Sequence, residues 1–178
     1  MKLERYKVLM IILAVLVFAG TVFYVICVKN SGIVLEIRDT ETGRVYGSWA
    51  LEEPGEFSIE YIHSVNMSPV RETFVYEGKK IRLKSVRFHS FGAGMQSYTD
   101  EGQALTRDGD AFVITGFNVS FNKLNYISGT VFDHLVFDHL LIINDEIISL
   151  RDLAGINPDG KSAHITIQYR DNFVLRRR

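Results

Sequence analysis

Cysteine is almost missing from this chain of 178 residues, and its scarcity excludes two kinds of structure. With only Cys27, the chain can form neither an intrachain disulfide nor a zinc site built from several cysteines. The HxH and HExxH spacings that mark many histidine metal sites are also missing. From Gly32 onward, no segment has helical periodicity over more than about two turns. These absences favour strands and provide no ready-made catalytic or metal motif.

An excess of positive charge is missing as well. Residues 29–178 contain 17 Lys or Arg and 20 Asp or Glu, because Lys2, Arg5, Lys7 and Glu4 precede them. Their net charge is therefore about −3, whereas a nucleic-acid partner requires a strongly basic face. We expect no nucleic-acid partner.

A long hydrophobic run stands near the start of the chain. Val8 to Val28 comprises 21 residues without charge or proline, 14 of them Leu, Ile, Val or Phe. As a helix rising about 1.5 Å per residue, the run would span about 31 Å, close to the hydrocarbon thickness of about 30 Å. A cleavable signal peptide is the alternative, but its apolar core is usually about 7 to 15 residues and ends at a small-x-small site. We expect an uncleaved transmembrane helix in the lipid bilayer.

The charges around this run predict its orientation. Lys2, Arg5 and Lys7 precede it, whereas only Lys29 follows closely. Cytoplasmic flanks carry the excess of Lys and Arg, so the N-terminus is expected in the cytoplasm. The predicted organisation is a cytoplasmic stub and anchor over residues 1–29 and an extracytoplasmic domain over residues 30–178, in a single-pass protein of the cell membrane.

Short alternating segments dominate the predicted domain. Ile33 to Arg38 and Val45 to Leu51 are expected to pair, and a hairpin is expected around residues 144–146. In Lys80 to His89 the apolar side chains change parity near Ser85, which predicts a β-bulge or a change of packing partner there. Residues 96–110 are polar and predict an exposed loop. The fold class is therefore all-β, an antiparallel sandwich or partly open barrel preceded by one transmembrane helix.

The most informative stretch is a predicted hairpin within residues 57–76. Its two runs alternate around the turn Asn66-Met-Ser-Pro69, and the expected register places Tyr61 opposite Phe74 and Ile59 opposite Tyr76. The same register places His63 opposite Glu72. An imidazole and a carboxylate would then meet at the open end of an apolar face.

Several motifs together resemble a known bacterial family. They are Tyr61-x-His63-Ser64-Val65, Pro69-Val70-x-Glu72-x-Phe74, Gly92-Ala93-Gly94-Met95, His139-Leu-Leu and Leu150-x-x-Leu153-Ala154-Gly155. In this order, over residues 33–170, the chain resembles the family catalogued as domain of unknown function 1850. Residues 98–130 match no feature of that family.

The resemblance implies a small extracytoplasmic protein encoded beside the fused membrane subunit of a TAXI-type TRAP transporter. It therefore implies a transport accessory whose partner is the transporter's membrane subunit or solute-binding protein. The resemblance implies no established activity, no cofactor and no catalytic residue.

The candidate binding residues are His63, Ser64, Glu72, Gly92, Gly94 and His139. Glu72 could orient His63 for a ligand, a metal or a partner, or could simply tie down the hairpin. A metal site could combine His63, Glu72, His89 and His139. Residues 92–94 could form an anion-binding nest, although such runs are usually tight turns. Ser64 follows His63 directly, so on a strand the two point to opposite faces and cannot form a catalytic pair.

Two functional hypotheses follow. The leading one is a non-enzymatic, membrane-anchored accessory of a TRAP-type transporter that docks through residues 57–95. The alternative is a tethered small-molecule- or metal-binding domain, or a hydrolase, centred on His63 and Glu72. A pocket that holds both residues would favour the alternative.

Overall fold

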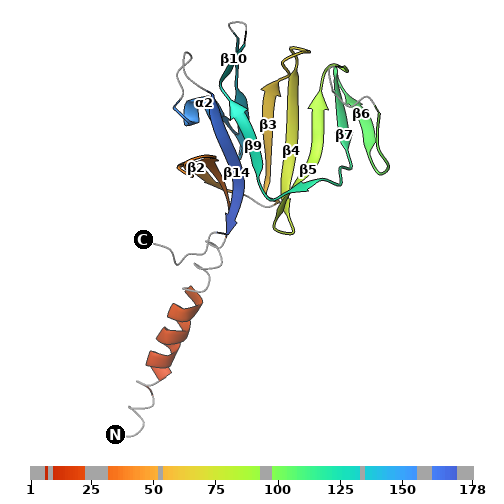
Figure 1. Ribbon diagram of the computed structural model, residues 1–178. Coiled ribbons are helices and arrows are strands. Elements are labelled where there is room, and N and C mark those ends of the chain that lie inside the picture. The colour runs from red at the N-terminus through yellow and green to blue at the C-terminus, as the bar shows by residue number, and fades with distance from the viewer. Residues whose placement is uncertain are drawn as a thin grey trace. The chain divides into compact units, whose positions relative to one another are not determined.

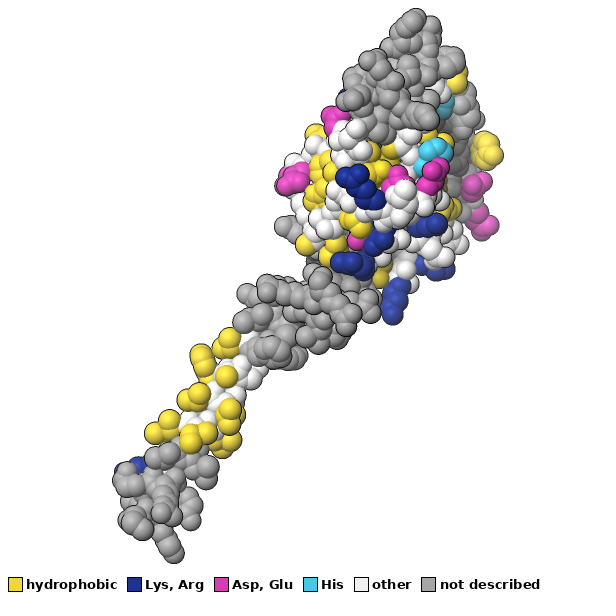
Figure 2. Space-filling view, turned by 60° about the vertical axis from the view of Figure 1, so that its left-hand side comes forward, with side chains coloured by type: hydrophobic (Ala, Val, Ile, Leu, Met, Phe, Trp, Pro, Cys, Tyr) yellow, Lys and Arg dark blue, Asp and Glu magenta, His cyan; other side chains and the backbone are white. Residues whose placement is uncertain are grey.

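The computed structural model describes Lys7 and residues 10–22, 32–51, 54–92, 98–132, 135–155 and 162–171, and it divides the chain into two units. The first unit is residues 1–32 with 171–178, in which residues 10–22 are helical and, in the view of Figure 2, carry hydrophobic side chains. The predicted span, Val8 to Val28, falls partly outside the described residues. Among the described helices, none has the length and apolar character needed to cross a membrane.

The second unit, Ile33–Arg170, contains two main sheets (Figure 1). The smaller consists of β1 (Ile33–Asp39), β2 (Val45–Ala50), β9 (Leu124–Ser128) and β14 (Ala163–Asp171), in the order β2–β1–β14–β9. The larger consists of β3 (Glu56–Ile62), β4 (Pro69–Glu77), β5 (Lys80–Phe88), β6 (Ala104–Asp108), β7 (Ala111–Thr115), β8 (Ser120–Phe121), β12 (His139–Ile143) and β13 (Glu146–Ser149). Its order is β13–β12–β3–β4–β5–β7–β6, and β8 also pairs with β5.

The remaining elements lie beside these sheets. β10 (Thr130–Phe132) and β11 (Leu135–Phe137) form a separate antiparallel pair, and α2 (Leu150–Leu153) follows β13 directly. Both main sheets are open rather than closed into a barrel. Of the two predicted architectures, the antiparallel all-β sandwich is therefore the one observed.

The main core lies between the two sheets because alternate residues of each strand point inward. The smaller sheet contributes Leu35, Ile37, Leu124, Ile165 and Ile167, and the larger contributes Phe57, Ile59, Phe74, Ile81, Leu141 and Ile143. Phe57 and Phe74 are paired across β3 and β4, with stacked rings 5.4 Å apart. The predicted inward faces of the central hairpin are thus confirmed.

A bulge divides β5 between two cores, as the change of parity predicts. Thr73 pairs with Ser85 but Phe74 pairs with Leu83, so Lys84 is the extra residue. Before the bulge, Ile81 packs into the main core. After it, Phe88 packs with Val70 and Ile114 in a second core to which none of the described residues of the smaller sheet contributes. The added residue therefore keeps Val86 and Phe88 on the same face of the sheet as Ile81, although the alternation in the sequence changes parity.

Two sequence predictions about the larger sheet are wrong. Residues 104–108 were expected in a loop but form β6, the edge strand beside β7. All five side chains of β6 are exposed, so burial imposes no alternation on them, and the strand is held by its backbone pairing with β7.

The predicted register of the central hairpin is also wrong, by four residues. Glu72 lies opposite Ile59, not His63, and Tyr61 lies opposite Val70. The turn occupies residues 63–68, and Pro69 is the first residue of β4, a position where proline's missing N–H is tolerated. The expected pairs of Glu72 with His63, Phe74 with Tyr61 and Tyr76 with Ile59 therefore do not form.

The turn between β12 and β13 allows the backbone conformation of residues 144 and 145 to be tested. Asn144 and Asp145 have φ of 47° and 64°, as a two-residue hairpin turn requires, and this confirms the hairpin predicted around residues 144–146. Asp145→Gly should raise the free energy of unfolding by about 0.5 to 1 kcal/mol, because glycine adopts this conformation without strain. Asp145→Ala should lower it. Urea unfolding midpoints measure both, and a loss of stability in the glycine variant would contradict this turn.

Candidate functional site

A polar cluster lies between the two sheets, where a purely apolar contact would be expected. Tyr61 of β3 and Glu72 of β4 come from the larger sheet, and Tyr126 comes from β9 of the smaller one. The Tyr61 hydroxyl donates to Glu72 Oε1 at 3.2 Å, and the Tyr126 hydroxyl donates to Glu72 Oε2 at 2.9 Å. Each carboxylate oxygen thus has a donor, and one of the two bonds joins the sheets.

Burial controls the protonation of this cluster. Removal from water raises the pKa of Glu72, and the two tyrosine hydrogen bonds oppose that rise only in part. Burial and the neighbouring carboxylate raise the pKa of Tyr61 and of Tyr126. Both tyrosines therefore stay protonated at neutral pH and act as donors.

His139 completes the cluster from β12. It pairs with Tyr61 across β3 and β12, and its ring lies 5.2 Å from the Tyr61 ring and 5.1 Å from the Tyr126 ring. Its Nδ1 is buried and has no hydrogen-bond partner among the described residues. Burial lowers the pKa of His139, so the imidazole is neutral in the folded protein at pH 7.

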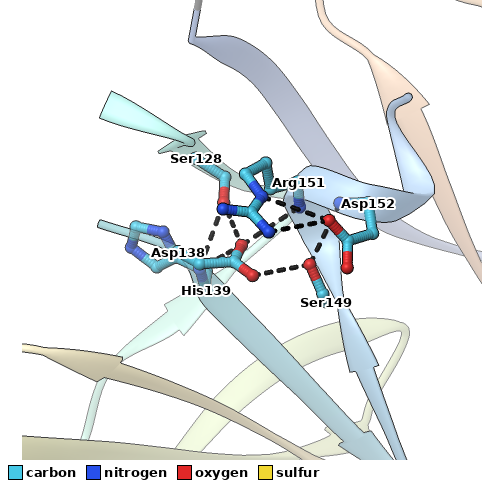
Figure 3. Close-up of polar contacts among 6 residues, drawn as sticks. All are labelled: Ser128, Asp138, His139, Ser149, Arg151 and Asp152. Atoms are coloured by element: carbon cyan, nitrogen blue, oxygen red, sulfur yellow. Dashed lines mark hydrogen bonds and ion pairs between the residues drawn. The ribbon is translucent and has the colours of Figure 1, made fainter. Parts of the chain in front are cut away.

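The residue before it, Asp138, anchors the start of β12 (Figure 3). Its carboxylate accepts from the hydroxyls of Ser128 at 2.8 Å and Ser149 at 2.5 Å. It also accepts from the backbone N–H groups of His139 and Arg151. Ser149 in turn caps α2, accepting from the Asp152 backbone N–H at 3.0 Å. Asp138 therefore joins β9, β12, β13 and α2 and fixes the backbone that carries His139.

A cleft of about 360 Å³ opens beside Glu72. It is lined by Glu72 and Phe74 of β4, Leu83 of β5, Phe121 of β8, and Lys123, Leu124, Asn125 and Tyr126 at and before β9. Four of these side chains are apolar and four are polar. Pockets that bind small molecules usually have volumes of about 300 to 1,000 Å³ and combine apolar walls with a few polar groups.

The six predicted site residues do not gather in one place. Glu72 and His139 share the polar cluster, since both contact Tyr61 and Tyr126. Gly92 instead lies near the hairpin turn, where its carbonyl accepts from Asn66 Nδ2 at 3.2 Å. Gly94 lies outside the described residues.

His63 and Ser64 belong to the turn between β3 and β4. The His63 Nδ1 accepts from the backbone N–H groups of Val65 and Asn66 at 3.3 and 3.4 Å. His63 thus stabilises its own turn, and Ser64 is exposed. His89, which also belonged to the suggested metal set, has its Nε2 3.6 Å from Asp110 Oδ1. Within the described ranges, no three His, Cys, Asp or Glu residues are grouped so that they could hold a metal ion.

Sequence reasoning missed the two tyrosine donors and the polar residues of the cleft. Tyr61 has the alternation of a core residue, and only the true register shows that it reaches Glu72. Lys123, Asn125 and Tyr126 lie in a region without recognisable motifs. No local signal predicts that β9 packs beside β4, because the two strands belong to different sheets.

Comparison with known proteins gives one match. A model of the family described as "Domain of unknown function (DUF1850)" matches residues 57–150, more than half of the chain. These residues contain Tyr61, Glu72, Tyr126 and His139. No curated protein and no solved structure matches the chain.

The lowered pKa of His139 predicts how stability depends on pH. In the unfolded chain His139 has its ordinary pKa of 6.5, so the unfolded chain binds a proton at this imidazole more readily than the folded chain does. The contribution of His139 to the free energy of unfolding is therefore complete above pH 6.5 and is lost as the pH falls. His139→Gln removes this dependence but retains that of Glu72, so the stability of the wild type minus that of the variant should decrease from about pH 7.5 to pH 5. Urea unfolding across this range measures it, and a constant or growing difference would contradict a buried neutral His139.

Proposed function

The chain belongs to the DUF1850 family, and on that premise we propose that it is a membrane-anchored, extracytoplasmic and non-enzymatic accessory protein of a TAXI-type TRAP transporter. It docks on the membrane subunit or on the solute-binding protein. The anchor is Val8 to Val28, as the length and composition of that run indicate. Several hydrophobic side chains of the described helix, from Met10 to Phe18, are more than half exposed, which suits a lipid environment.

An exposed apolar surface within residues 57–95 is the observation that carries the docking proposal. It consists of Ile62, Val65, Met67 and Phe91, with exposed fractions of 43%, 69%, 51% and 38%; we call it the apolar tip. Asn66 joins its two segments, because Nδ2 donates to the carbonyls of Ser90 and Gly92. Exposed apolar groups gathered on one loop pair are typical of interaction surfaces.

The apolar tip lies at the end of the sandwich opposite to both ends of the β unit. The Tyr169 hydroxyl, near the end of β14, donates to the Gly55 carbonyl just before β3. Thr40, just after β1, donates its backbone N–H to the His164 carbonyl at the start of β14, so β1 begins at the Tyr169 end. Because β3 runs from Gly55 toward the turn, the end of β14 and the β3–β4 turn lie at opposite ends of the sandwich (Figure 1).

A second candidate function is binding of a small molecule, and the cleft beside Glu72 favours it. This candidate replaces a site centred on His63 and Glu72, because the two residues are not paired and His63 caps its own turn. A metal site or a hydrolase site centred on His63 has no support among the described residues. His63 and Ser64 do not line the cleft, and no group of potential metal ligands is found in the part of the chain that the structure describes.

A matched pair of variants tests the docking proposal. Val65→Asp places a charge on the apolar tip, and Ile147→Asp places one on an equally exposed residue of β13, with fractions of 69% and 68%. When the full chain is purified from mild detergent together with the transporter, Val65→Asp should lower the retained partner at least about tenfold, because burying a carboxylate against an apolar surface is unfavourable.

The Ile147→Asp variant should retain the partner at the wild-type level. Equal retention by both variants would exclude the tip as the contact. Failure of the wild type to retain either transporter component would contradict the accessory function itself.

A further inference from the structure

The cleft beside Glu72 combines an apolar wall with two charged positions. Phe74, Leu83, Phe121 and Leu124 supply the wall. Glu72 stands at one position, largely removed from water between the two sheets. Lys123 stands at the other, exposed on the short link before β9. A ligand that fills this cleft must therefore satisfy an anion, a cation and an apolar surface together.

The anionic position is incompletely satisfied. A carboxylate has about four acceptor sites, and the two tyrosine hydroxyls occupy two of them. No Lys or Arg in the described part of the chain forms an ion pair with Glu72, although its burial disfavours an isolated negative charge. An ammonium group in the cleft would provide both the missing charge and further donors.

The cationic position is free as well. Across the described ranges, Lys123 has no ion pair and no hydrogen bond, although it lines the cleft. Asn125 also belongs to the lining, but on β9 it alternates with Leu124 and Tyr126, which point into the sandwich, and its Oδ1 accepts from Thr166 at 2.8 Å on the opposite face of the sheet. The lysine ammonium is therefore the group that suits a carboxylate.

We propose that this cleft binds a small zwitterion with an apolar side chain, that is, an aliphatic or aromatic α-amino acid. The ligand's ammonium group pairs with Glu72, its carboxylate faces Lys123, and its side chain lies against Phe74, Leu83, Phe121 and Leu124. This inference rests on the second candidate function, binding of a small molecule, and is independent of docking through the apolar tip.

Other ligand classes fit the cleft less well. A simple carboxylic acid would bring a second negative group beside Glu72 or leave it unpaired. A simple amine would leave Lys123 unused, and a hydrated metal ion would gain nothing from the four apolar side chains. Only a ligand carrying both charges on an apolar body uses all of the lining.

Three probes of similar size separate these possibilities. L-phenylalanine carries both charged groups, phenethylamine lacks the carboxylate, and 3-phenylpropanoate lacks the ammonium group. Calorimetric titration of the full chain in lipid nanodiscs should show binding of L-phenylalanine, with each of the other probes weaker by at least about tenfold. Equal binding of phenethylamine, or no binding of L-phenylalanine at millimolar concentration, would overturn the proposal.

Two variants assign the charges. Glu72→Gln should weaken L-phenylalanine and phenethylamine but not 3-phenylpropanoate, and its unfolding midpoint shows whether the fold is retained. Lys123→Gln, an exposed change, should weaken L-phenylalanine at least about tenfold and leave phenethylamine unchanged. Lys79→Gln, on an exposed turn outside the cleft, is the matched control and should bind like the wild type.

An unaltered affinity in Lys123→Gln would refute the zwitterion assignment. The same preparations can be tested for retention of the transporter. A chain that retains the transporter but binds no amino acid would disprove this inference alone, and the reverse outcome would disprove the docking function alone.

Discussion

The hydrogen bonds to Glu72 are the constraint on which the site depends. A carboxylate between two sheets must replace the water it loses, and two tyrosine hydroxyls do this from opposite sides of the sandwich. These hydrogen bonds reduce the cost of burying the Glu72 carboxylate, but they do not neutralise its negative charge. The tyrosine rings also enclose His139, whose backbone Asp138 fixes. A chain optimised only for packing would have an apolar residue at position 72.

The asymmetry of the sandwich explains why a cleft opens there. Four strands face eight, and β9 is the edge of the smaller sheet. Beyond that edge, the second core of Val70, Phe88 and Ile114 is packed by residues of the larger sheet and its loops. The bulge at Lys84 keeps the apolar side chains of β5 on one face of the larger sheet, so that Ile81 reaches the first core and Phe88 the second. The cleft beside Glu72 lies where the first core ends.

Alternation predicted the strands well, because burial on one face imposes a period of two on the sequence. It located the bulge near Ser85 and the inward faces of β3 and β4. It failed for β6, whose exposed side chains carry no such signal. Register depends on turn geometry. The turn over residues 63–68 shifts every β3–β4 pair by four residues, an even number, so each side chain stays on its predicted face. Alternation therefore located the faces but misplaced His63. Tyr126 and Lys123 could not be assigned to the site, because contacts between separate sheets leave no local pattern.

The central claim is that Glu72 is a buried carboxylate that the tyrosines satisfy only in part. Selective ¹³C labelling of glutamate in the full chain, with the Glu72 carboxyl signal identified by Glu72→Gln, allows its pKa to be measured by NMR titration. We expect a pKa above the ordinary value of 4.5, and a further rise in Tyr126→Phe, because that hydroxyl lowers it. A pKa at or below 4.5 in the wild type, or no change in Tyr126→Phe, would contradict the account.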